Sequence, residues 1–151
     1  MNNDGENKTC LITSSEDLGD SRMPFWAGAS IFHIRYLKDV YSSEVFSMNP
    51  NGENTKRLTH NQATDYYPRT SIGGKIIFTS EHKLINGAQI WSMGLDGSDL
   101  KQLTDTQGYS CAWSPDGKYI VYTDSRRENG RLWVMDGDGK NKRQLTFVHH
   151  F

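Results

Sequence analysis

The chain has few cysteines, no surplus of one charge and no long apolar run. Two of its 151 residues are cysteine, which is too few for a disulfide scaffold. Its 17 basic and 18 acidic side chains give a formal net charge of −1, whereas a dedicated nucleic-acid binder usually carries a basic surplus. The most apolar stretch, residues 24–32, is half the ~18 residues that a membrane-spanning helix needs. We therefore expect neither nucleic-acid binding nor membrane insertion.

The sequence also lacks the short motifs of several functional classes. Residues 1–5 have no basic head and no apolar run follows them, so no signal peptide is expected. There is no Gly-x-x-x-x-Gly-Lys and no Gly-x-Gly-x-x-Gly for a nucleotide. The five histidines show neither a His-x-x-x-His nor a His-Glu-x-x-His spacing. We expect no cofactor and no metal site.

What the sequence does contain is an internal repeat. Four Trp, seven Tyr and six Phe supply a β-rich core, and one pattern recurs four times: Met, two residues, Asp or Asn, Gly, five residues, Leu. The copies are Met1–Leu11, Met48–Leu58, Met93–Leu103 and Met135–Leu145. Their predicted turn residues are Asp4, Gly5, Asn51, Gly52, Asp96, Gly97, Asp138 and Gly139. The distances between successive methionines are 47, 45 and 42 residues, which is the period of a propeller blade with four strands.

Each period is predicted to consist of short β-strands. Apolar runs such as Ile90–Met93 and Leu132–Met135 come before the turn and are rich in aromatic and β-branched residues, as in strands covered on both faces. The Asn-Gly or Asp-Gly pair that follows favours a hairpin with a type I′ turn. The segment ending in Leu-Thr is the returning strand. About four strands and no helix are expected per period.

One segment carries a family resemblance. Trp113-Ser114-Pro115-Asp116-Gly117-Lys118, followed by Ile120–Thr123, Leu132–Met135, Asp138-Gly139 and Gln144-Leu145-Thr146, resembles the WD-repeat-like β-propeller repeat of TolB-type proteins. The match is close over residues 110–147 and looser over 66–104 and 22–59. The resemblance implies a β-propeller and a periplasmic partner network near the outer membrane. The same repeat also occurs in propellers attached to prolyl-oligopeptidase-like and tricorn-like proteases, so it specifies architecture rather than function.

The predicted fold is therefore all-β, with three four-stranded antiparallel propeller blades in a single partial domain over residues 1–151. The blades are expected at residues 22–59, 66–104 and 110–147, after a leftover outer strand within residues 1–13. Known propellers have about 4–8 blades, and bare sheet edges promote aggregation. Two explanations remain open: the chain is part of a longer propeller, or two copies form a homodimer that closes a six-bladed ring.

Binding is expected at one end of the blades. If the strands of a blade are named a to d from the propeller axis outwards, the b–c and d–a loops share one end. The b–c loops, at residues 35–43, 80–88 and 124–130, differ in length and sequence, as recognition loops on repeated scaffolds do. Their candidate binding residues are Tyr36, Lys38, Tyr41, His82, Lys83, Arg126 and Arg127.

Two other patterns are better explained by the repeat than by chemistry. Residues 136–141 resemble a calcium loop, but Lys140 and Asn141 occupy its fifth and sixth positions, so a hairpin turn is expected. Residues 108–112 approach a nucleophile elbow around Ser110, but no helix is expected to follow. Cys10 and Cys111 fall in different strand types of different blades, so both are expected to be reduced, with Cys111 buried.

We therefore expect a non-catalytic protein-interaction scaffold resembling part of a TolB-like propeller, and not an enzyme. Two alternatives remain. One is the substrate-gating propeller of a prolyl-oligopeptidase-like hydrolase whose catalytic domain is absent here. The other is a propeller that binds a small ligand or sugar.

Overall fold

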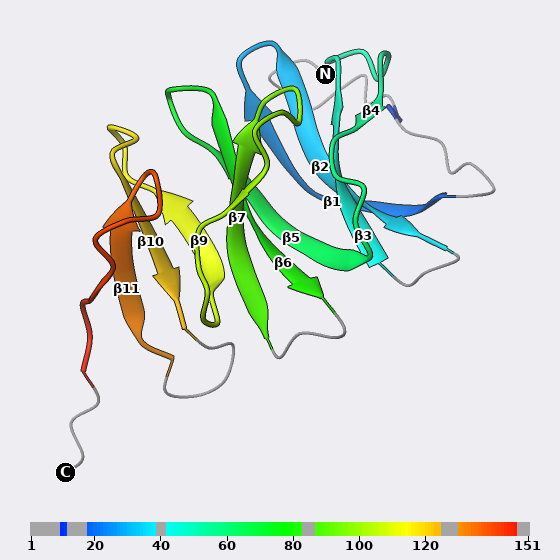
Figure 1. Ribbon diagram of the computed structural model, residues 1–151. Coiled ribbons are helices and arrows are strands. Elements are labelled where there is room, and N and C mark those ends of the chain that lie inside the picture. Colours follow the sequence, from blue (N-terminus) through cyan, green and yellow to red (C-terminus); the bar gives the residue numbers. More distant parts are fainter. Residues whose placement is uncertain (1–9, 12–17, 39–41, 83–86, 125–129, 148–151) are drawn as a thin grey trace.

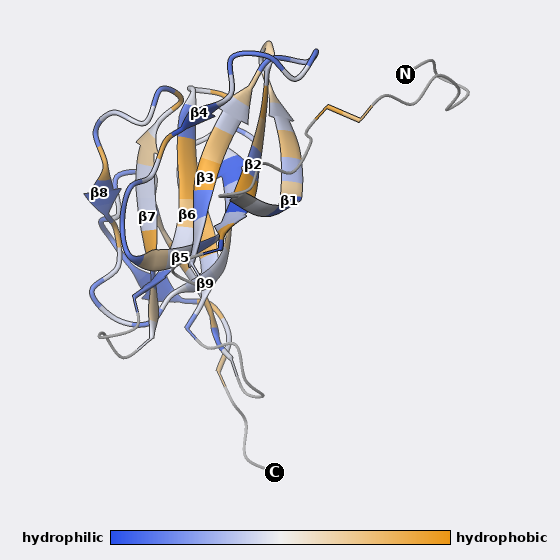
Figure 2. Cartoon of the chain, turned by 90° about the vertical axis from the view of Figure 1, so that its right-hand side faces the viewer, coloured by the Kyte–Doolittle hydropathy of each residue, from blue (hydrophilic) through white to orange (hydrophobic). Residues whose placement is uncertain are grey.

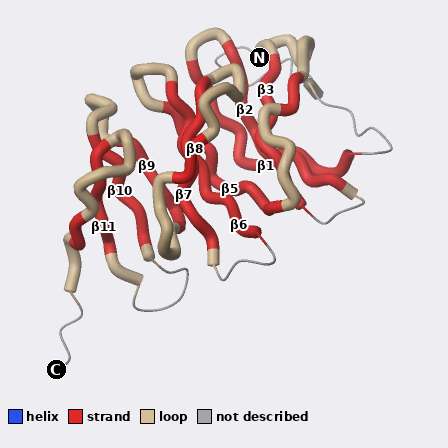
Figure 3. Tube along the Cα trace, viewed as in Figure 1, coloured by secondary structure: helices blue, strands red, loops and turns tan. Residues whose placement is uncertain are grey.

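The protein consists of three β-sheets that stand side by side in chain order (Figure 1). The computed structural model describes residues 10–11, 18–38, 42–82, 87–124 and 130–147. Within these ranges every regular element is a strand, and no helix occurs (Figure 3). Each sheet has four antiparallel strands in the order of the sequence. The prediction of an all-β fold with three four-stranded blades is confirmed.

We call the sheets blades 1 to 3. Blade 1 contains β1 (Leu18–Ala27), β2 (Ser30–Leu37), β3 (Ser42–Met48) and β4 (Lys56–Arg57). Blade 2 contains β5 (Ala63–Thr70), β6 (Lys75–His82), β7 (Ala88–Gly94) and β8 (Lys101–Gln102). Blade 3 contains β9 (Tyr109–Trp113), β10 (Tyr119–Thr123), β11 (Leu132–Asp136) and β12 (Arg143–Gln144). Of the expected leftover strand in residues 1–13, including Asp4 and Gly5, only Cys10 and Leu11 lie within the described residues.

The turn between strands c and d differs from the predicted type I′ hairpin. Of the predicted Asx-Gly pair only the glycine has a positive φ, for example +89° at Gly97 and +89° at Gly139, and a second residue with positive φ follows two positions later, at Asn54, Asp99 and Asn141. The glycine N–H donates to the carbonyl three residues earlier, as from Gly139 to Asp136 at 2.9 Å. This geometry is a right-handed turn closed by a left-handed glycine, the usual three-residue hairpin loop.

The side chain of the Asx residue explains why the chain adopts the right-handed turn rather than the type I′ turn. Asn51, Asp96 and Asp138 each accept a hydrogen bond at Oδ1 from the backbone N–H two residues later, at 3.2, 3.0 and 3.1 Å. This Asx contact satisfies the amide after the glycine while the Asx residue itself keeps a negative φ. The repeated Asx-Gly pair therefore encodes the turn, but through side-chain capping.

The repeated Leu-Thr pair joins strand d to strand c. The hydroxyls of Thr59, Thr104 and Thr146 accept a hydrogen bond from the strand-c N–H 14 residues earlier, at 2.9, 2.9 and 2.8 Å. The leucine N–H before each threonine donates to the carbonyl of that same strand-c residue. Strand d is only two residues long in each blade, so these contacts extend its attachment beyond the regular ladder.

The core lies between the blades rather than within one of them. Phe32, Val45 and Leu58 of blade 1 form one buried cluster with Ile76, Phe78 and Met93 of blade 2. Ile77, Ile90 and Leu103 of blade 2 form another with Cys111, Ile120, Tyr122 and Met135 of blade 3. Each blade therefore has a front face toward the next blade and a back face toward the previous one. Figure 2 shows the apolar bands on the strands and the hydrophilic turns beyond them.

The turns lock neighbouring blades at their outer edge. Lys56 Nζ donates to the carbonyl of Asp96, and Lys101 Nζ donates to the carbonyl of Asp138, both at 2.8 Å. A Cβ added to Gly97 would lie 3.0 Å from the carbonyl oxygen of Leu58, so the close approach requires glycine. Gly52 contacts the backbone of Leu11 in the same way. Leu11 therefore holds the place before blade 1 that Leu58 holds before blade 2.

Every strand a contains a bulge at the same place. Met23, Tyr67 and Ser110 all have positive φ, between 45° and 53°, and precede Pro24, Pro68 and Cys111. The ladder shifts register at this point in all three blades. Ser110 thus owes its backbone to a bulge that each blade repeats, and it lies in β9 rather than before a helix. Residues 108–112 therefore do not form a nucleophile elbow.

Candidate functional site

The predicted recognition loops lie at one end of the blades, and three of their seven candidate residues are described. Tyr36 is half-buried near the end of β2, and the guanidinium carbon of Arg22 lies 5.1 Å from its ring centre. Lys38 is exposed after β2. His82 ends β6 and lines a pocket between blades 1 and 2. Tyr41, Lys83, Arg126 and Arg127 lie outside the described residues. Of these three residues, His82 therefore lies in the lining of a cavity.

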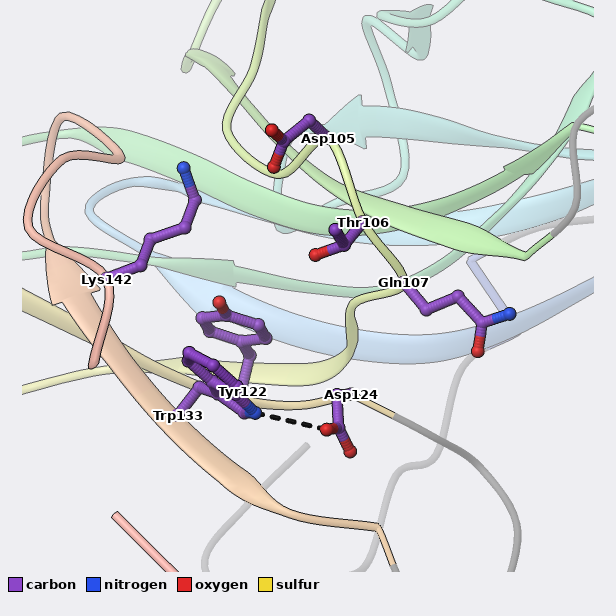
Figure 4. Close-up of a pocket in the computed structure, with 7 residues that line it drawn as sticks. All are labelled: Asp105, Thr106, Gln107, Tyr122, Asp124, Trp133 and Lys142. Carbon is purple, nitrogen blue, oxygen red and sulfur yellow. Dashed lines mark hydrogen bonds between the residues drawn. The ribbon is translucent and has the colours of Figure 1, made fainter. Parts of the chain in front are cut away.

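A larger pocket lies between blades 2 and 3 at this same end (Figure 4). Its volume is about 510 Å³, within the ~300–1,000 Å³ range of ligand pockets. The d–a connection from β8 to β9 forms one wall, and the ends of β10, β11 and the turn before β12 form the other. The lining residues are Asp105, Thr106, Gln107, Tyr122, Asp124, Trp133 and Lys142. We call this cavity the acidic pocket.

Two aromatic side chains form its floor. Tyr122 on β10 and Trp133 on β11 are directly opposite each other in the antiparallel ladder, so both rings lie on the back face of blade 3. The Trp133 indole N–H donates to Asp124 Oδ2 at 3.1 Å, as the dashed line in Figure 4 shows. Asp124 directly follows β10, and its other oxygen, Oδ1, accepts the Arg131 backbone N–H at 2.8 Å. Trp133 and Asp124 therefore hold each other in place.

The Tyr122 hydroxyl is the one polar group of the floor without a hydrogen-bond partner among the described residues. The side chain is only 2% exposed and lines the acidic pocket. Burial, followed by the charges of Asp105 and Asp124, raises the pKa of Tyr122. The phenol therefore stays protonated at neutral pH, with its oxygen available to a ligand.

The opposite wall is held by the backbone of blade 2. The Gly108 N–H donates to the carbonyl of Ala88 at 2.7 Å, and the Tyr109 hydroxyl accepts the Ala88 N–H at 3.3 Å. Gly87 has φ +94°, and a Cβ there would lie 2.5 Å from Gln107 Cγ. Glycine at this position therefore lets the Gln107 side chain pack against β7.

Blades 1 and 2 form a pocket at the equivalent place, but its lining is nearly neutral. Its volume is about 320 Å³, and the ladder pair on its floor is Phe78 and Trp91. Counted along the strands from this pair, Ser80 stands where blade 3 has Asp124, and Leu100 where blade 3 has Lys142. The scaffold therefore repeats the cavity, and the side chains give each cavity its own chemistry. We call this one the neutral pocket.

Sequence reasoning found the end of the blades but missed the residues of the acidic pocket. Asp124 falls inside the predicted b–c loop, yet Asp105 belongs to a d–a loop whose residues were not singled out. The sequence prediction assigned Tyr122 and Trp133 to strands and gave them no role in binding. Comparing the repeats position by position would have shown Asp124 against Ser80 and Tyr122 against Phe78.

Two buried titratable groups outside the acidic pocket have raised pKa values. Burial raises the pKa of the Cys111 thiol to about 12, and Cys111 is buried as predicted, while Cys10 is exposed. Burial also raises the pKa of Asp65 to about 7, and Ser80 Oγ donates to its Oδ1 at 2.6 Å. Among the described residues no group of three or more His, Cys, Asp or Glu side chains could hold a metal ion. No described segment is a helix able to span a membrane.

Two relatives share substantial sequence identity with this chain. The chain is 32% identical over 124 residues to the "Tol-Pal system protein TolB" of Roseobacter denitrificans, which covers 72% of this chain and 28% of the relative. It is 40% identical over 105 residues to the "Hydrazine synthase subunit alpha" of Kuenenia stuttgartiensis, which covers 65% of this chain and 12% of the relative. The chain thus spans less than a third of the length of either relative.

The fold and a family model agree with these relationships. TolB from Acinetobacter baumannii superposes with a TM-score of 0.73 at 21% identity, over 96% of this chain and 36% of that one, and shares its fold. The model of the TolB beta propeller domain, PD40, matches residues 33–150. This match takes in most of blade 1 and all of blades 2 and 3. The chain therefore belongs to the TolB β-propeller domain family.

Proposed function

We propose that the protein is a non-catalytic interaction module that binds a protein partner at the loop end of its blades. The observation that carries this proposal is the acidic pocket, a cavity between two blades that opens among the connections that differ most from blade to blade. The strands beneath it are fixed by repeated Thr and Leu contacts, whereas the lining side chains differ between the two junctions. A rigid scaffold with variable loops is the usual design of a recognition surface.

The surroundings of the acidic pocket support binding more than bond-breaking chemistry. Asp124 is engaged by the Trp133 N–H and the Arg131 N–H, so both of its oxygens are already positioned. Ser110 belongs to a bulge that all three blades repeat. Lys142 and Asp105 are exposed at the rim, where a partner's side chain has access.

Selection from a displayed peptide library against the full chain tests this proposal. We expect enriched peptides to compete with one another, and to bind less well to a variant with Asp105→Asn and Lys38→Ala at the loop end. A matched variant at the opposite end, Lys118→Ala, carries an exposed lysine on an a–b turn and should leave binding unchanged. Equal binding to all variants, or no enrichment over an unrelated domain, would contradict a binding surface at the loop end.

A further inference from the structure

We propose that the acidic pocket binds the guanidinium group of an arginine side chain from the protein partner. This inference rests on the proposed function, because it names the chemistry that the same loop end recognises. Three features of the described residues lead to it: the balance of charge, the kind of polar atom left unpaired, and the aromatic floor.

The charge of the lining favours a cation. Asp105 and Asp124 contribute two carboxylates, and Lys142 contributes the only cation among the lining residues. After burial, the charges of these two carboxylates are the further causes that raise the pKa of Tyr122 on the floor. Figure 4 shows Lys142 on the opposite side of the aromatic pair from Asp124. Among the described lining residues one negative charge therefore remains uncompensated.

The oxygen atoms of Asp105, Asp124 and Tyr122 in the pocket lining can accept hydrogen bonds. The Tyr122 oxygen has no partner among the described residues although its side chain is almost fully buried. A guanidinium carries five N–H donors and no acceptor, so it suits a tyrosine oxygen between two carboxylates. An anion would instead meet the two carboxylates at close range.

The aromatic floor distinguishes arginine from lysine. A planar guanidinium stacks on an indole face while its edge donates to a carboxylate, which a compact ammonium does not do. Trp133 and Asp124 already present a ring and a carboxylate joined by a 3.1 Å hydrogen bond. The pocket therefore offers an indole face for stacking and a carboxylate for hydrogen bonding, held next to each other.

The neutral pocket supplies an internal control. It has the same tryptophan position, Trp91, but carries Phe78 and Ser80 where the acidic pocket has Tyr122 and Asp124. An arginine that binds the carboxylates and the tyrosine of the acidic pocket should not bind the neutral pocket.

The test is a titration of the full chain with N-acetyl-arginine amide, followed through the tryptophan indole N–H signals in two-dimensional NMR spectra. N-acetyl-citrulline amide is the matched control, since it has the same shape without the charge. We expect the Trp133 signal to shift with arginine and the Trp91 signal to stay in place. Binding of the citrulline compound should be at least about tenfold weaker, the size of a lost charged hydrogen bond.

Two substitutions use residues that blade 2 already carries at the same positions. Asp124→Ser should weaken arginine binding by about tenfold or more, and Tyr122→Phe by several-fold. Asp105→Asn lies in an exposed connection, so it tests the charge even if Asp124→Ser disturbs the fold. Unchanged backbone amide signals in blades 1 and 2 would show that each variant is folded.

The outcomes separate this inference from the proposed function. Equal binding of arginine and citrulline, preference for N-acetyl-lysine amide, or no shift of Trp133 would each overturn the arginine assignment. If selected peptides still bind the loop end without needing an arginine, the interaction module stands and only its chemistry is wrong. If no peptide binds that end either, both fail.

Discussion

The front faces of blades 2 and 3 carry the same repeat but differ sharply in burial. Ile90 is fully buried, whereas Leu132, at the same place in strand c, is 40% exposed. Leu103 of the Leu-Thr pair is 5% exposed and Leu145 is 42% exposed. Thr104 is buried and Thr146 is exposed, although both hold the same backbone hydrogen bond. A repeat position therefore sets hydrogen bonding within a blade, while the neighbouring blade sets burial.

The same difference corrects one sequence prediction. Leu132–Met135 was expected to be covered on both faces, as Ile90–Met93 is. The back position Met135 is 1% exposed, but Leu132 and Val134 on the front are not fully buried. No described blade follows blade 3, so nothing described covers its front. The apolar pattern of the strand therefore does not by itself determine how far the front face of blade 3 is buried.

The largest expected effect comes from truncating the equivalent leucines. Leu103→Ala should lower the free energy of unfolding by about 2–5 kcal/mol, because it leaves a cavity in the core between blades 2 and 3. Leu145→Ala should change it by less than about 0.5 kcal/mol, because that side chain is largely exposed. Denaturant unfolding of the two variants measures this difference. Similar losses would show that blade 3 is covered in solution.

A second comparison concerns the interface between blades 1 and 2 and the interface between blades 2 and 3. Only the first interface contains a buried carboxyl group in strand a. Asp65 is fully buried in β5, and counting back from Tyr66 and Tyr109 places Gly108 at the equivalent position. Burial raises the pKa of Asp65 from 3.8 to about 7. The folded state therefore holds this proton more tightly than the unfolded chain does.

The sign of the pH dependence follows from that shift. The stabilising effect of the Asp65 proton is complete below pH 3.8 and is lost as pH rises toward 7 and above. The loss is at most about 4 kcal/mol over this window. Asp65→Asn should flatten that part of the profile while keeping an acceptor for the Ser80 hydroxyl. Unfolding measured from pH 4 to 8 provides the check, and an unchanged slope in the variant would rule out Asp65 as the cause.

A smaller effect is expected at the turn that locks blade 2 onto blade 1. Gly97→Ala should destabilise by about 1–3 kcal/mol, from a positive φ and a Cβ 3.0 Å from the Leu58 carbonyl oxygen. Gly28→Ala is the control, because Gly28 also has a positive φ, +56°, but nothing lies within 4 Å of its added Cβ. Thermal unfolding should rank Gly97→Ala as the more damaging change. Equal losses would mean that backbone conformation alone matters there.

The smallest expected effect concerns the mass of the protein in solution, for which we predict no association of chains. A homodimer that closes a six-bladed ring needs the front of blade 3 to pack on the back of blade 1. Ile31, His33, Phe46 and Met48 on that back face are already between 1% and 7% exposed. We therefore expect light scattering to give the 17.2 kDa mass of one chain. Twice that mass, with loss of the dimer on Leu132→Asp, would instead establish the ring.

Much of the fold was predictable because its signals are local. The Met-to-Leu spacing located three turns, and the apolar runs located strands c in all three blades. The turn type was wrong because Asn51, Asp96 and Asp138 cap the backbone with their side chains, which composition alone does not reveal. The bulges at Met23, Tyr67 and Ser110 were missed, because three different residue types share one backbone shape there.

The candidate site was less predictable because it joins residues from separate segments. Asp105 lies in the connection between blades 2 and 3 and Asp124 follows β10, and only the packing of the blades places both near Tyr122. The sequence by itself determined the repeat and the antiparallel blades with their Thr and Asx contacts, since the paired residues within a blade lie fewer than 20 positions apart. The tertiary structure alone decided which apolar faces are covered and which side chains share a pocket, since both depend on how one blade lies against the next.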